Sequence, residues 1–341
     1  MKLPRRLRRF RATASIREMV QETRLHPSQL IAPLFVKEGS GQASIASMPG
    51  VKRFSIGELG AFCRRMENCG VRGVAIFPCV APSKKDAAAS EALNPNNLAI
   101  RAIRKVKLDA PRLLVFADIA LDPYTAHGHD GLVNPATGEV DNDSTVEKLA
   151  EMAVLHAGAG ADFVAPSDMM DGRVSAIRSA LDNAGFTGTG ILSYAIKYAS
   201  SYYGPFRDAV GSKQAAGKMY LDKRSYQMNP ANVREALLEA ALDEDEGADM
   251  LMVKPAGLYL DVIAKLRGQT RLPIAAYQVS GEYAQICAAA NMGWLDHDRA
   301  AWESVLAIRR AGADLILTYF AQKIAAQIER DNTPTTKIKA V

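Results

Sequence analysis

The sequence is poor in cysteine and lacks long apolar runs, and both features exclude whole classes of protein. Its four cysteines show neither the CxxC spacing of a metal or redox motif nor the pattern of a disulfide framework. No run of about eighteen apolar residues occurs, so no transmembrane helix is expected. No apolar segment follows the basic N-terminus, as one would in a secretory signal. Together these absences predict a cytoplasmic protein without a membrane partner.

The positive charge of the chain is modest and is concentrated at one end. The formal net charge is +5, and much of it comes from Arg5, Arg6, Arg8, Arg9 and Arg11. A basic arm can bind nucleic acid, but no nucleic-acid-binding fold signature and no aromatic stacking platform accompanies this one. We therefore expect no nucleic acid partner, and we interpret the arm as a segment that packs on a neighbouring subunit.

Strand-like apolar runs alternate with helical patterns along the chain. Such alternation indicates parallel βαβ units, and the number of units in this chain predicts a (β/α)8 TIM barrel in the α/β class. A doubly wound sheet is the alternative, but no GxGxxG follows any of the runs. The eight runs cover residues 30–36, 73–80, 112–121, 161–167, 188–197, 248–254, 273–280 and 313–320.

The predicted division of the chain has three parts. An extended N-terminal arm over residues 1–27 precedes a catalytic barrel over 28–330, and residues 331–341 form a C-terminal tail. The barrel carries a long insertion at about 198–226 that is rich in tyrosine, glycine and lysine. Long ordered loops at a barrel mouth are often lids, so we expect this insertion to cover the site.

Lys254 is the most informative residue, because it ends the apolar run 248–254 just before Pro255. Burying an ammonium is costly unless it is paired or loses its proton. A lysine whose pKa is pushed toward neutrality can form a Schiff base with a ketone. Lys197 ends another run in the same way. Two lysines at the same end of adjacent strands are expected to lower each other's pKa by like-charge repulsion.

Other polar residues at strand ends complete a coherent set. Asp118 lies near the end of the third run and Ser167 ends the fourth. A carboxylate near two amines can hold positive charge in place or transfer protons. Hydroxyl and cationic groups that could anchor a carboxylate are supplied by Ser280, Tyr319, Arg207 and Lys223. The inventory predicts a substrate with a ketone to condense and a carboxylate to hold.

Several segments resemble the porphobilinogen synthase (delta-aminolevulinate dehydratase) family. The matches extend from about residue 5 to residue 325 and are long enough to be specific. They include MVKP at 252–255, SYAIKYAS at 193–200, YGPFR at 203–207, YQVSGEY at 277–283, DPYTAHGHDG at 122–131, PLFV at 33–36 and MPG at 48–50.

The resemblance implies a TIM-barrel lyase of tetrapyrrole (heme) biosynthesis. It condenses two molecules of 5-aminolevulinate into porphobilinogen with loss of two waters, and it works as a homo-oligomer, an octamer in this interpretation. Lys254 matches the Schiff-base lysine of the family, and Lys197 matches the second lysine that acts with it. Asp118 is a candidate for proton transfer or imine stabilisation, and Ser167 is a candidate for supporting Asp118. Substrate contacts fall on Arg207 and Lys223, with Lys218 or Arg224 as alternatives to Lys223, and on Ser280 and Tyr319, which hold the second carboxylate.

The resemblance also divides the metal question into two sites. Zinc-dependent members carry cysteines where this chain has Ala120, Asp122 and Asp130. Because zinc prefers thiolates, no zinc is expected in the active site. Asp122 and Asp130 could still bind a hard cation. His127 and His129 are interpreted as structural residues. Glu239 matches the position of an allosteric Mg²⁺ at a subunit interface, although an ordinary solvated helix carboxylate would look the same.

Two other functions are alternatives to this one. Another Schiff-base TIM-barrel aldolase acting on phosphorylated sugars would need an anion-binding nest after the seventh and eighth strands. Gly281 alone offers little support for such a nest. A barrel that binds RNA through its basic arm would show strongly salt-dependent binding.

Overall fold

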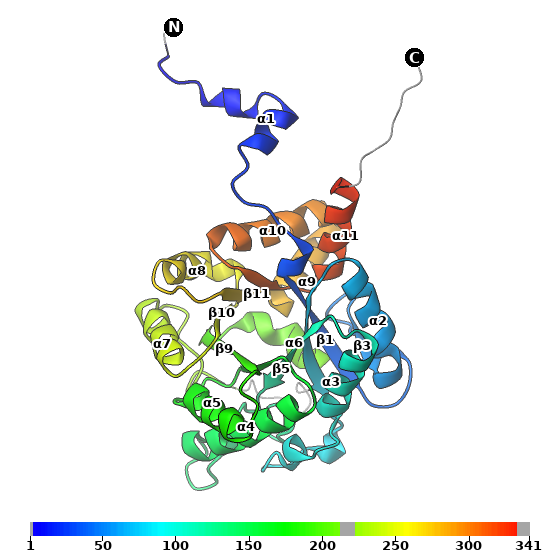
Figure 1. The fold of residues 1–341 in the computed structure, drawn as a ribbon, viewed down its shortest axis with the longest axis vertical. Helices are drawn as coiled ribbons and strands as arrows, with labels where there is room; N and C mark the ends of the chain where they lie inside the picture. The colour runs from blue at the N-terminus through cyan, green and yellow to red at the C-terminus, as the bar shows by residue number, and fades with distance from the viewer. Residues whose placement is uncertain (1–2, 212–221, 333–341) are drawn as a thin grey trace.

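Eight parallel strands close into a barrel in the computed structural model, which describes residues 3–211 and 222–332 (Figure 1). Neighbouring barrel strands follow chain order, and the last strand pairs with the first through Leu30 and Ile316. The strands are apolar along nearly their whole length because both of their faces are covered. They are β1 (Leu30–Lys37), β4 (Gly73–Cys79), β5 (Leu114–Ile119), β8 (Phe163–Pro166), β9 (Gly190–Lys197), β10 (Met250–Lys254), β11 (Ile274–Tyr277) and β12 (Leu315–Leu317).

Amphipathic helices form the outer layer of the barrel. In α3, for example, Ile103 and Val106 are buried toward the strands. Side-chain caps begin several helices, as where Asn97 accepts a hydrogen bond from the Ile100 N–H at 2.9 Å. The longer helices are α2 (Ile56–Asn68), α3 (Leu98–Asp109), α4 (Asn142–Gly158), α5 (Arg173–Asn183), α7 (Arg234–Asp245), α8 (Leu260–Arg267), α9 (Ser280–Asn291), α10 (His297–Ala311) and α11 (Ala321–Asn332).

Short strands and single helical turns lie outside the eight barrel strands and the longer helices. A hairpin of β2 (Gln42–Ser44) and β3 (Lys52–Ser55) extends the sheet beside β1, and β6 (Leu132–Val133) pairs with β7 (Val140–Asp141). The predicted lid begins with η5 (Ser201–Tyr203) and α6 (Gly204–Ala209); its residues 212–221 lie outside the described part. The remaining single turns are η2 (Pro27–Gln29), η3 (Pro82–Lys84), η4 (Ser90–Leu93) and η6 (Gly257–Tyr259).

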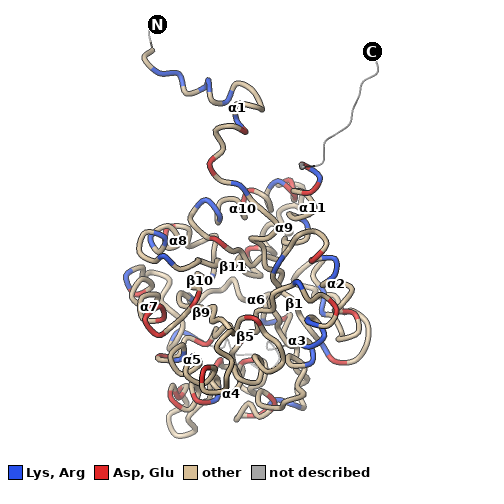
Figure 2. The backbone as a smooth tube through the Cα atoms, in the orientation of Figure 1, with Lys and Arg blue, Asp and Glu red and all other residues tan. Residues whose placement is uncertain are grey.

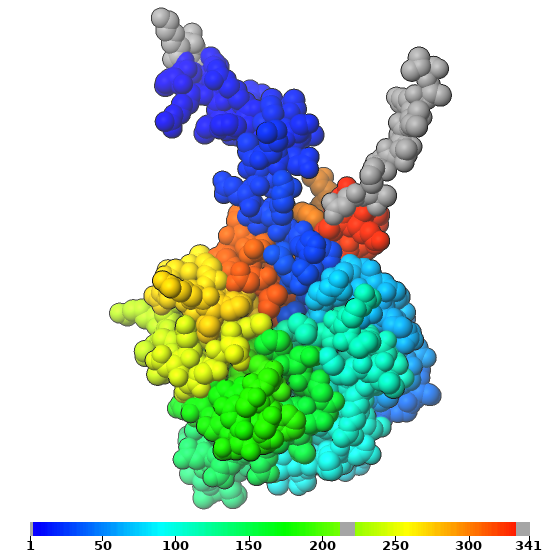
Figure 3. Space-filling model, viewed as in Figure 1, coloured from blue at the N-terminus to red at the C-terminus, as the bar shows by residue number. Residues whose placement is uncertain are grey.

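The N-terminal arm projects away from the barrel (Figures 1 and 3). It contains η1 (Leu7–Arg11) and α1 (Ala14–Met19), neither of which has a buried residue. Lys and Arg are frequent along it (Figure 2), yet Leu7, Phe10 and Met19 are also exposed. Exposed apolar side chains grouped on one segment indicate a contact surface.

The structure confirms the predicted barrel and corrects the ends of several strands. All eight predicted runs contain a strand, and every strand except β1 is shorter than its run, with the largest differences at β5, β11 and β12. The seventh run was predicted to continue to Ser280, whereas β11 ends at Tyr277 and Ser280 begins α9. The cause is local, because the Val279 N–H donates to the Glu282 carboxylate at 2.7 Å and turns the chain into a helix. No helix of the described residues is long and apolar enough to cross a membrane.

Candidate active site

Most of the polar residues predicted to form the site converge on one cavity at the carboxyl ends of the barrel strands. This is the end of a TIM barrel at which active sites lie. The lid contributes part of the wall through η5 and α6. The cavity is lined by Phe77, Asp118, Asp122, Asp130, Ser167, Lys197, Tyr203, Phe206, Arg207, Lys223, Gln227 and Lys254.

Lys254 and Lys197 are direct neighbours, as predicted. They are paired across the parallel ladder of β10 and β9, so both amines leave the barrel at the same level. Pro255 follows Lys254 and ends the strand there. Both lysines are buried, with exposed fractions of 7% and 5%.

The amine of Lys254 lies among aromatic rings. Its Nζ is 4.8 Å from the ring centroid of Tyr277, 4.9 Å from that of Tyr194, 5.3 Å from that of Tyr203 and 5.4 Å from that of Phe206. Ring faces replace only part of the hydration of an ammonium. Burial, and then the charge of Lys197, lower the pKa of Lys254 to about 7. A large fraction of this amine is therefore a neutral nucleophile at neutral pH.

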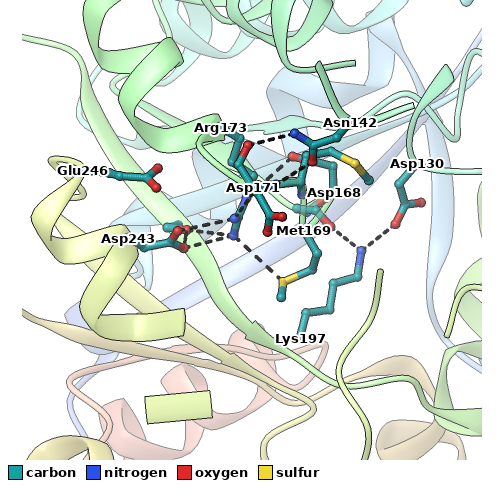
Figure 4. A network of polar contacts seen from close by, with 12 residues as sticks. Asp130, Asn142, Asp168, Met169, Asp171, Arg173, Lys197, Asp243 and Glu246 are labelled. Atoms are coloured by element: carbon teal, nitrogen blue, oxygen red, sulfur yellow. Dashed lines mark hydrogen bonds and ion pairs between the residues drawn. The ribbon is translucent and has the colours of Figure 1, made fainter. Parts of the chain in front are cut away.

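The amine of Lys197 has a different environment. It donates to Asp130 Oδ2 at 2.9 Å and to the backbone carbonyl of Ser167 (Figure 4). Burial alone would lower the pKa of Lys197, but Asp130 and Asp122 outweigh burial and raise it. The predicted mutual depression of the two pKa values is therefore right for Lys254 and wrong for Lys197. The reason is a carboxylate partner that strand periodicity could not reveal.

Asp130 holds two ammonium groups at once. Its second oxygen accepts from Lys223 Nζ at 2.5 Å, and Lys223 also lies 3.8 Å from Asp122. Burial tends to raise the pKa of Asp130, but Lys197 and Lys223 hold it far below its usual range. Asp130 is thus ionised and paired, as a buried carboxylate must be.

Asp118 is the carboxyl group best suited to exchange a proton. Burial, and then the charge of Asp122, raise the pKa of Asp118 to about 7, against the opposing effect of Lys254. Its Oδ1 is buried without a hydrogen-bond partner among the described residues. A carboxyl group and an amine with matching pKa values can pass a proton between them near neutral pH.

The predicted lid residues divide between the cavity and the surface. Arg207 and Lys223 both line the cavity. Arg224, the alternative to Lys223, instead extends to the surface and pairs with Asp222. Lys218, the other alternative, lies outside the described residues.

Ser280 and Tyr319 lie beside the cavity rather than in its lining. The Ser280 hydroxyl accepts from the Phe206 N–H at 2.9 Å and donates to the Tyr202 carbonyl at 3.2 Å. The Tyr319 hydroxyl is 2.9 Å from that of Tyr277. Both residues therefore contact groups that surround the Lys254 amine.

The predicted metal residues fall into two unlike places. Asp122 and Asp130 face lysines, whose charges disfavour a cation there. Glu239 lies on α7 in a separate acidic pocket with Glu139, Asp171 and Glu235. Burial raises the pKa of Glu239, with Arg173 acting in the opposite direction. Within residues 3–211 and 222–332, no three His, Cys, Asp or Glu side chains are arranged to hold a metal ion.

A buried ionic network near Lys197 was missed by the sequence reasoning. Arg173 is almost completely buried and pairs with Asp243 of α7 at 3.0 Å (Figure 4). It also lies 3.9 Å from Asp168, which follows Ser167 at the end of β8. Burial raises the pKa of Asp168 to about 6 although Arg173 opposes the change. The polar pair of Ser167 and Asp168 after an apolar run could have indicated this network from the sequence. No sequence pattern marked Arg173 as buried.

The aromatic residues around Lys254 were also missed individually. Tyr194, Tyr203, Phe206 and Tyr277 come from β9, η5, α6 and β11. The high density of tyrosines in the lid predicted that it packs onto something. Its target could not be named, because no local pattern relates the lid to Lys254.

The fold and this cavity define the class of the protein, a TIM-barrel enzyme with amines at adjoining strand ends suited to Schiff-base chemistry. Residues 4–327 match the family described as Delta-aminolevulinic acid dehydratase. The dehydratase of Chlamydia pneumoniae is 53% identical over 320 residues, covering 94% of this chain and 95% of that protein. The dehydratase of Methanothermobacter thermautotrophicus is 51% identical, with 95% and 97% covered.

A solved structure agrees with these relatives. The delta-aminolevulinic acid dehydratase of Toxoplasma gondii, in complex with the reaction product porphobilinogen, is 46% identical and superposes with a TM-score of 0.95. The match covers 99% of this chain and 96% of that one. The chain belongs to the delta-aminolevulinic acid dehydratase family. It is a hydro-lyase of porphyrin biosynthesis that forms porphobilinogen from 5-aminolevulinate, which sets aside the aldolase alternative.

Proposed function

We propose that Lys254 forms the first Schiff base of the reaction. Its buried, largely neutral amine among four rings carries this proposal. The amine attacks the ketone of one 5-aminolevulinate, a C=N bond replaces the C=O bond, and one water leaves. The protonated imine then withdraws electrons from the adjacent carbon far better than the ketone did.

Lys197 acts second in this scheme, on the other substrate molecule. Its ion pair with Asp130 keeps it protonated before substrate binds. It must lose a proton before it can attack a ketone, and substrate entering beside Asp130 would disturb the pair. Two lysines can thereby prepare two identical substrates in sequence, because their resting protonation states differ.

Asp118 is proposed to transfer protons, with Ser167 supporting it. The pKa of about 7 allows Asp118 to hold or release a proton at neutral pH. Replacing Asp118 with Asn should lower kcat by about 10²–10⁴-fold. The Lys254 imine should still be trapped by borohydride in that variant, which separates proton transfer from imine formation.

Four further residues are proposed to hold the substrates. Arg207 and Lys223 line the cavity from the lid and suit the carboxylate of one substrate. Ser280 and Tyr319 are proposed to hold the carboxylate of the other, close to the rings around Lys254. Ser280→Ala and Arg207→Ala should raise KM for 5-aminolevulinate more than they lower kcat, if each mainly anchors a carboxylate.

The reaction is proposed to need no zinc. Ala120, Asp122 and Asp130 offer no thiolate, and Asp130 is already neutralised by two ammonium groups. A hard cation at Asp122 and Asp130 is disfavoured for the same reason. Activity should survive a zinc-selective chelator, whereas stoichiometric zinc that alone restores lost activity would contradict the proposal.

Mg²⁺ is proposed to bind at Glu239 and to act allosterically. Mg²⁺ usually keeps several waters and is bound through one or two carboxylates, so Glu239 would be its ligand, and Asp171 and Glu235 in the same pocket would add negative charge. Bound Mg²⁺ would supply positive charge to this acidic surface. Asp243 lies one turn along α7 and connects through Arg173 to Asp168, beside the Ser167 carbonyl that contacts Lys197 (Figure 4). Glu239→Ala should abolish Mg²⁺ stimulation and leave basal turnover.

The chain is proposed to work in the cytoplasm as a homo-octamer. Its four cysteines are free, which suits a reducing compartment. The exposed apolar groups of the arm support a contact with a neighbouring subunit. Deleting residues 1–27 should produce smaller particles with lower activity on a sizing column with light scattering; unchanged size and rate would contradict an assembly role.

A further inference from the structure

The carboxylate of Glu282 connects two segments of the active site that are far apart in sequence. Glu282 lies in the first turn of α9 and is only 8% exposed. Its Oε1 accepts from the Gly257 N–H at 2.6 Å, while its Oε2 accepts from Val279 at 2.7 Å and from Ala256 at 3.4 Å. Ala256 and Gly257 directly follow Lys254 and Pro255. One carboxylate thus fixes both the start of α9 and the loop that leaves the Schiff-base lysine.

Gly257 shows that this contact is tight. A Cβ at Gly257 would lie 2.5 Å from Glu282 Oε1, closer than real Cβ contacts. The backbone of Gly257 is not in the left-handed region, so its own conformation does not demand glycine. A side chain at this position would instead displace the Glu282 carboxylate, to which the Gly257 N–H donates at 2.6 Å.

The same turn of α9 also holds the lid. The Ser280 hydroxyl bonds to Phe206 and Tyr202 of the lid. A Cβ at Gly281 would lie 2.6 Å from the Tyr202 Cα, so the two backbones are in close contact. Tyr203 and Phe206, which belong to this lid segment, supply two of the four rings around the Lys254 amine. The first turn of α9 therefore touches both the loop after Lys254 and the groups that surround its amine.

We propose that Glu282 is a positioning residue for Lys254. By fixing residues 256–257 to the start of α9, Glu282 keeps the Lys254 amine among its four aromatic rings. The proposal rests on Lys254 being the imine-forming lysine. Glu282 itself does not line the cavity and touches no reacting atom. Loss of the tether should let the Lys254 backbone shift relative to its rings, and a displacement of about 1 Å can cost about 10²-fold in rate.

The test compares Glu282→Gln and Gly257→Ala with the wild-type enzyme. Glutamine keeps the size of the side chain but turns one acceptor into a donor that faces an N–H, whereas Gly257→Ala attacks the same contact from the other side. Both variants should lower kcat by about 10- to 100-fold. After borohydride trapping with 5-aminolevulinate and peptide mapping, the ratio of Lys254 adduct to Lys197 adduct should fall in parallel.

Asp296→Ala provides a matched control for the loss of a helix-capping carboxylate. Asp296 caps the neighbouring α10 by accepting from the Arg299 N–H at 2.9 Å, so its carboxylate bonds within α10 and not to the backbone of residues 256–257. This variant should lose stability but keep the wild-type adduct ratio. Where Glu282→Gln fails to fold, Gly257→Ala carries the same comparison.

A double substitution separates a direct contact from two independent effects. If Gly257 matters through Glu282, then Gly257→Ala should add nothing to Glu282→Ala. Additive losses, or an adduct ratio that stays at the wild-type value, would overturn the positioning role. A wild-type enzyme with no adduct at Lys254 would overturn the proposed role of Lys254 and this inference with it, whereas wild-type trapping with unchanged variants overturns this inference alone.

Discussion

Lys254 and Lys197 occupy equivalent positions on adjacent strands, but their amines lie in opposite surroundings. Lys254 Nζ is surrounded by the rings of Tyr194, Tyr203, Phe206 and Tyr277. Lys197 Nζ forms an ion pair with Asp130, which is shared with Lys223. Burial lowers the pKa of a lysine wherever it occurs, and it prevails at Lys254. At Lys197 the carboxylates prevail, and the pKa rises.

The difference shows how one enzyme can treat two identical substrates differently. An apolar environment delivers an amine that is ready to attack, whereas an acidic environment delivers an ammonium that stays inert until its partner is disturbed. The chemistry of the two lysines is the same, so in the proposed scheme their neighbours set the order in which they react. Substitutions around either lysine test this difference.

The largest effect is expected from removing the Lys254 amine. Lys254→Ala should lower turnover by at least about 10⁴-fold, because the nucleophile is lost. Lys254→Arg should do no better, since a guanidinium stays protonated. Lys197→Ala should still form the adduct at Lys254, although porphobilinogen production falls. Steady-state pyrrole assays measure turnover, and peptide mapping locates the adduct. Robust turnover by Lys254→Ala would contradict the scheme.

Removing the shared carboxylate should be the most destabilising change in the acidic half. Asp130→Asn leaves the buried amines of Lys197 and Lys223 without their ionised partner. Breaking a buried ion pair in this way costs about 3–5 kcal/mol. Denaturant unfolding at neutral pH should show a loss of this size. Asp222→Asn, which removes an exposed partner of Arg224, is a control that should change stability little.

Replacing each lysine with methionine should change stability in opposite directions. The pKa of Lys254 falls from 10.5 to about 7 on folding, so between those values the unfolded chain binds a proton that the folded chain does not. Lys254 therefore destabilises the fold increasingly as pH falls from 10.5 to about 7. Lys254→Met should stabilise the protein by roughly 1–3 kcal/mol at pH 7 and by less at pH 9.

Lys197→Met should do the reverse. The pKa of Lys197 is raised on folding, so its contribution to stability is fully present below 10.5 and is lost only as pH rises through the folded value. This variant should be destabilised equally at pH 7 and pH 9. Unfolding curves at both values measure the contrast, and a destabilised Lys254→Met would break it.

The smallest expected effect is a shift of the pH dependence of imine formation. The Asp118 carboxylate raises the pKa of Lys254, against burial and Lys197. Asp118→Asn should therefore lower that pKa and move the acid limb of Lys254 trapping to lower pH by roughly 0.5–1 unit. Trapping rates across neutral pH measure the shift; a move to higher pH would show that Asp118 does not act on Lys254 through its charge.

The apolar patterns of the sequence were enough to predict the barrel and the pairing of its two lysines. Strands that are buried on both faces appear as continuous apolar runs, and closure of parallel strands places their carboxyl ends together. Lys197, Lys254, Asp118 and Ser167 accordingly meet in one cavity. The predicted end of the seventh strand was wrong because Glu282, a residue outside the run, turns the chain at Val279.

The environments of the lysines could not be predicted in the same way. The four rings around Lys254 come from separate elements, and Asp130 reaches Lys197 from the loop after β5. Such contacts depend on strand register and on how loops fold over the barrel mouth, neither of which leaves a periodic signal. The predicted protonation state of Lys197 failed for this reason, whereas that of Lys254 followed from burial.

The central claim is that Lys254 is the neutral amine and Lys197 the protonated one in the resting enzyme. Brief exposure to 5-aminolevulinate and borohydride over a series of pH values, followed by peptide mapping, measures each lysine separately. The Lys254 adduct should form first, with half-maximal rate near pH 7, and the Lys197 adduct should need higher pH or longer exposure. Equal trapping at both lysines, or trapping of Lys197 before Lys254 at neutral pH, would contradict it.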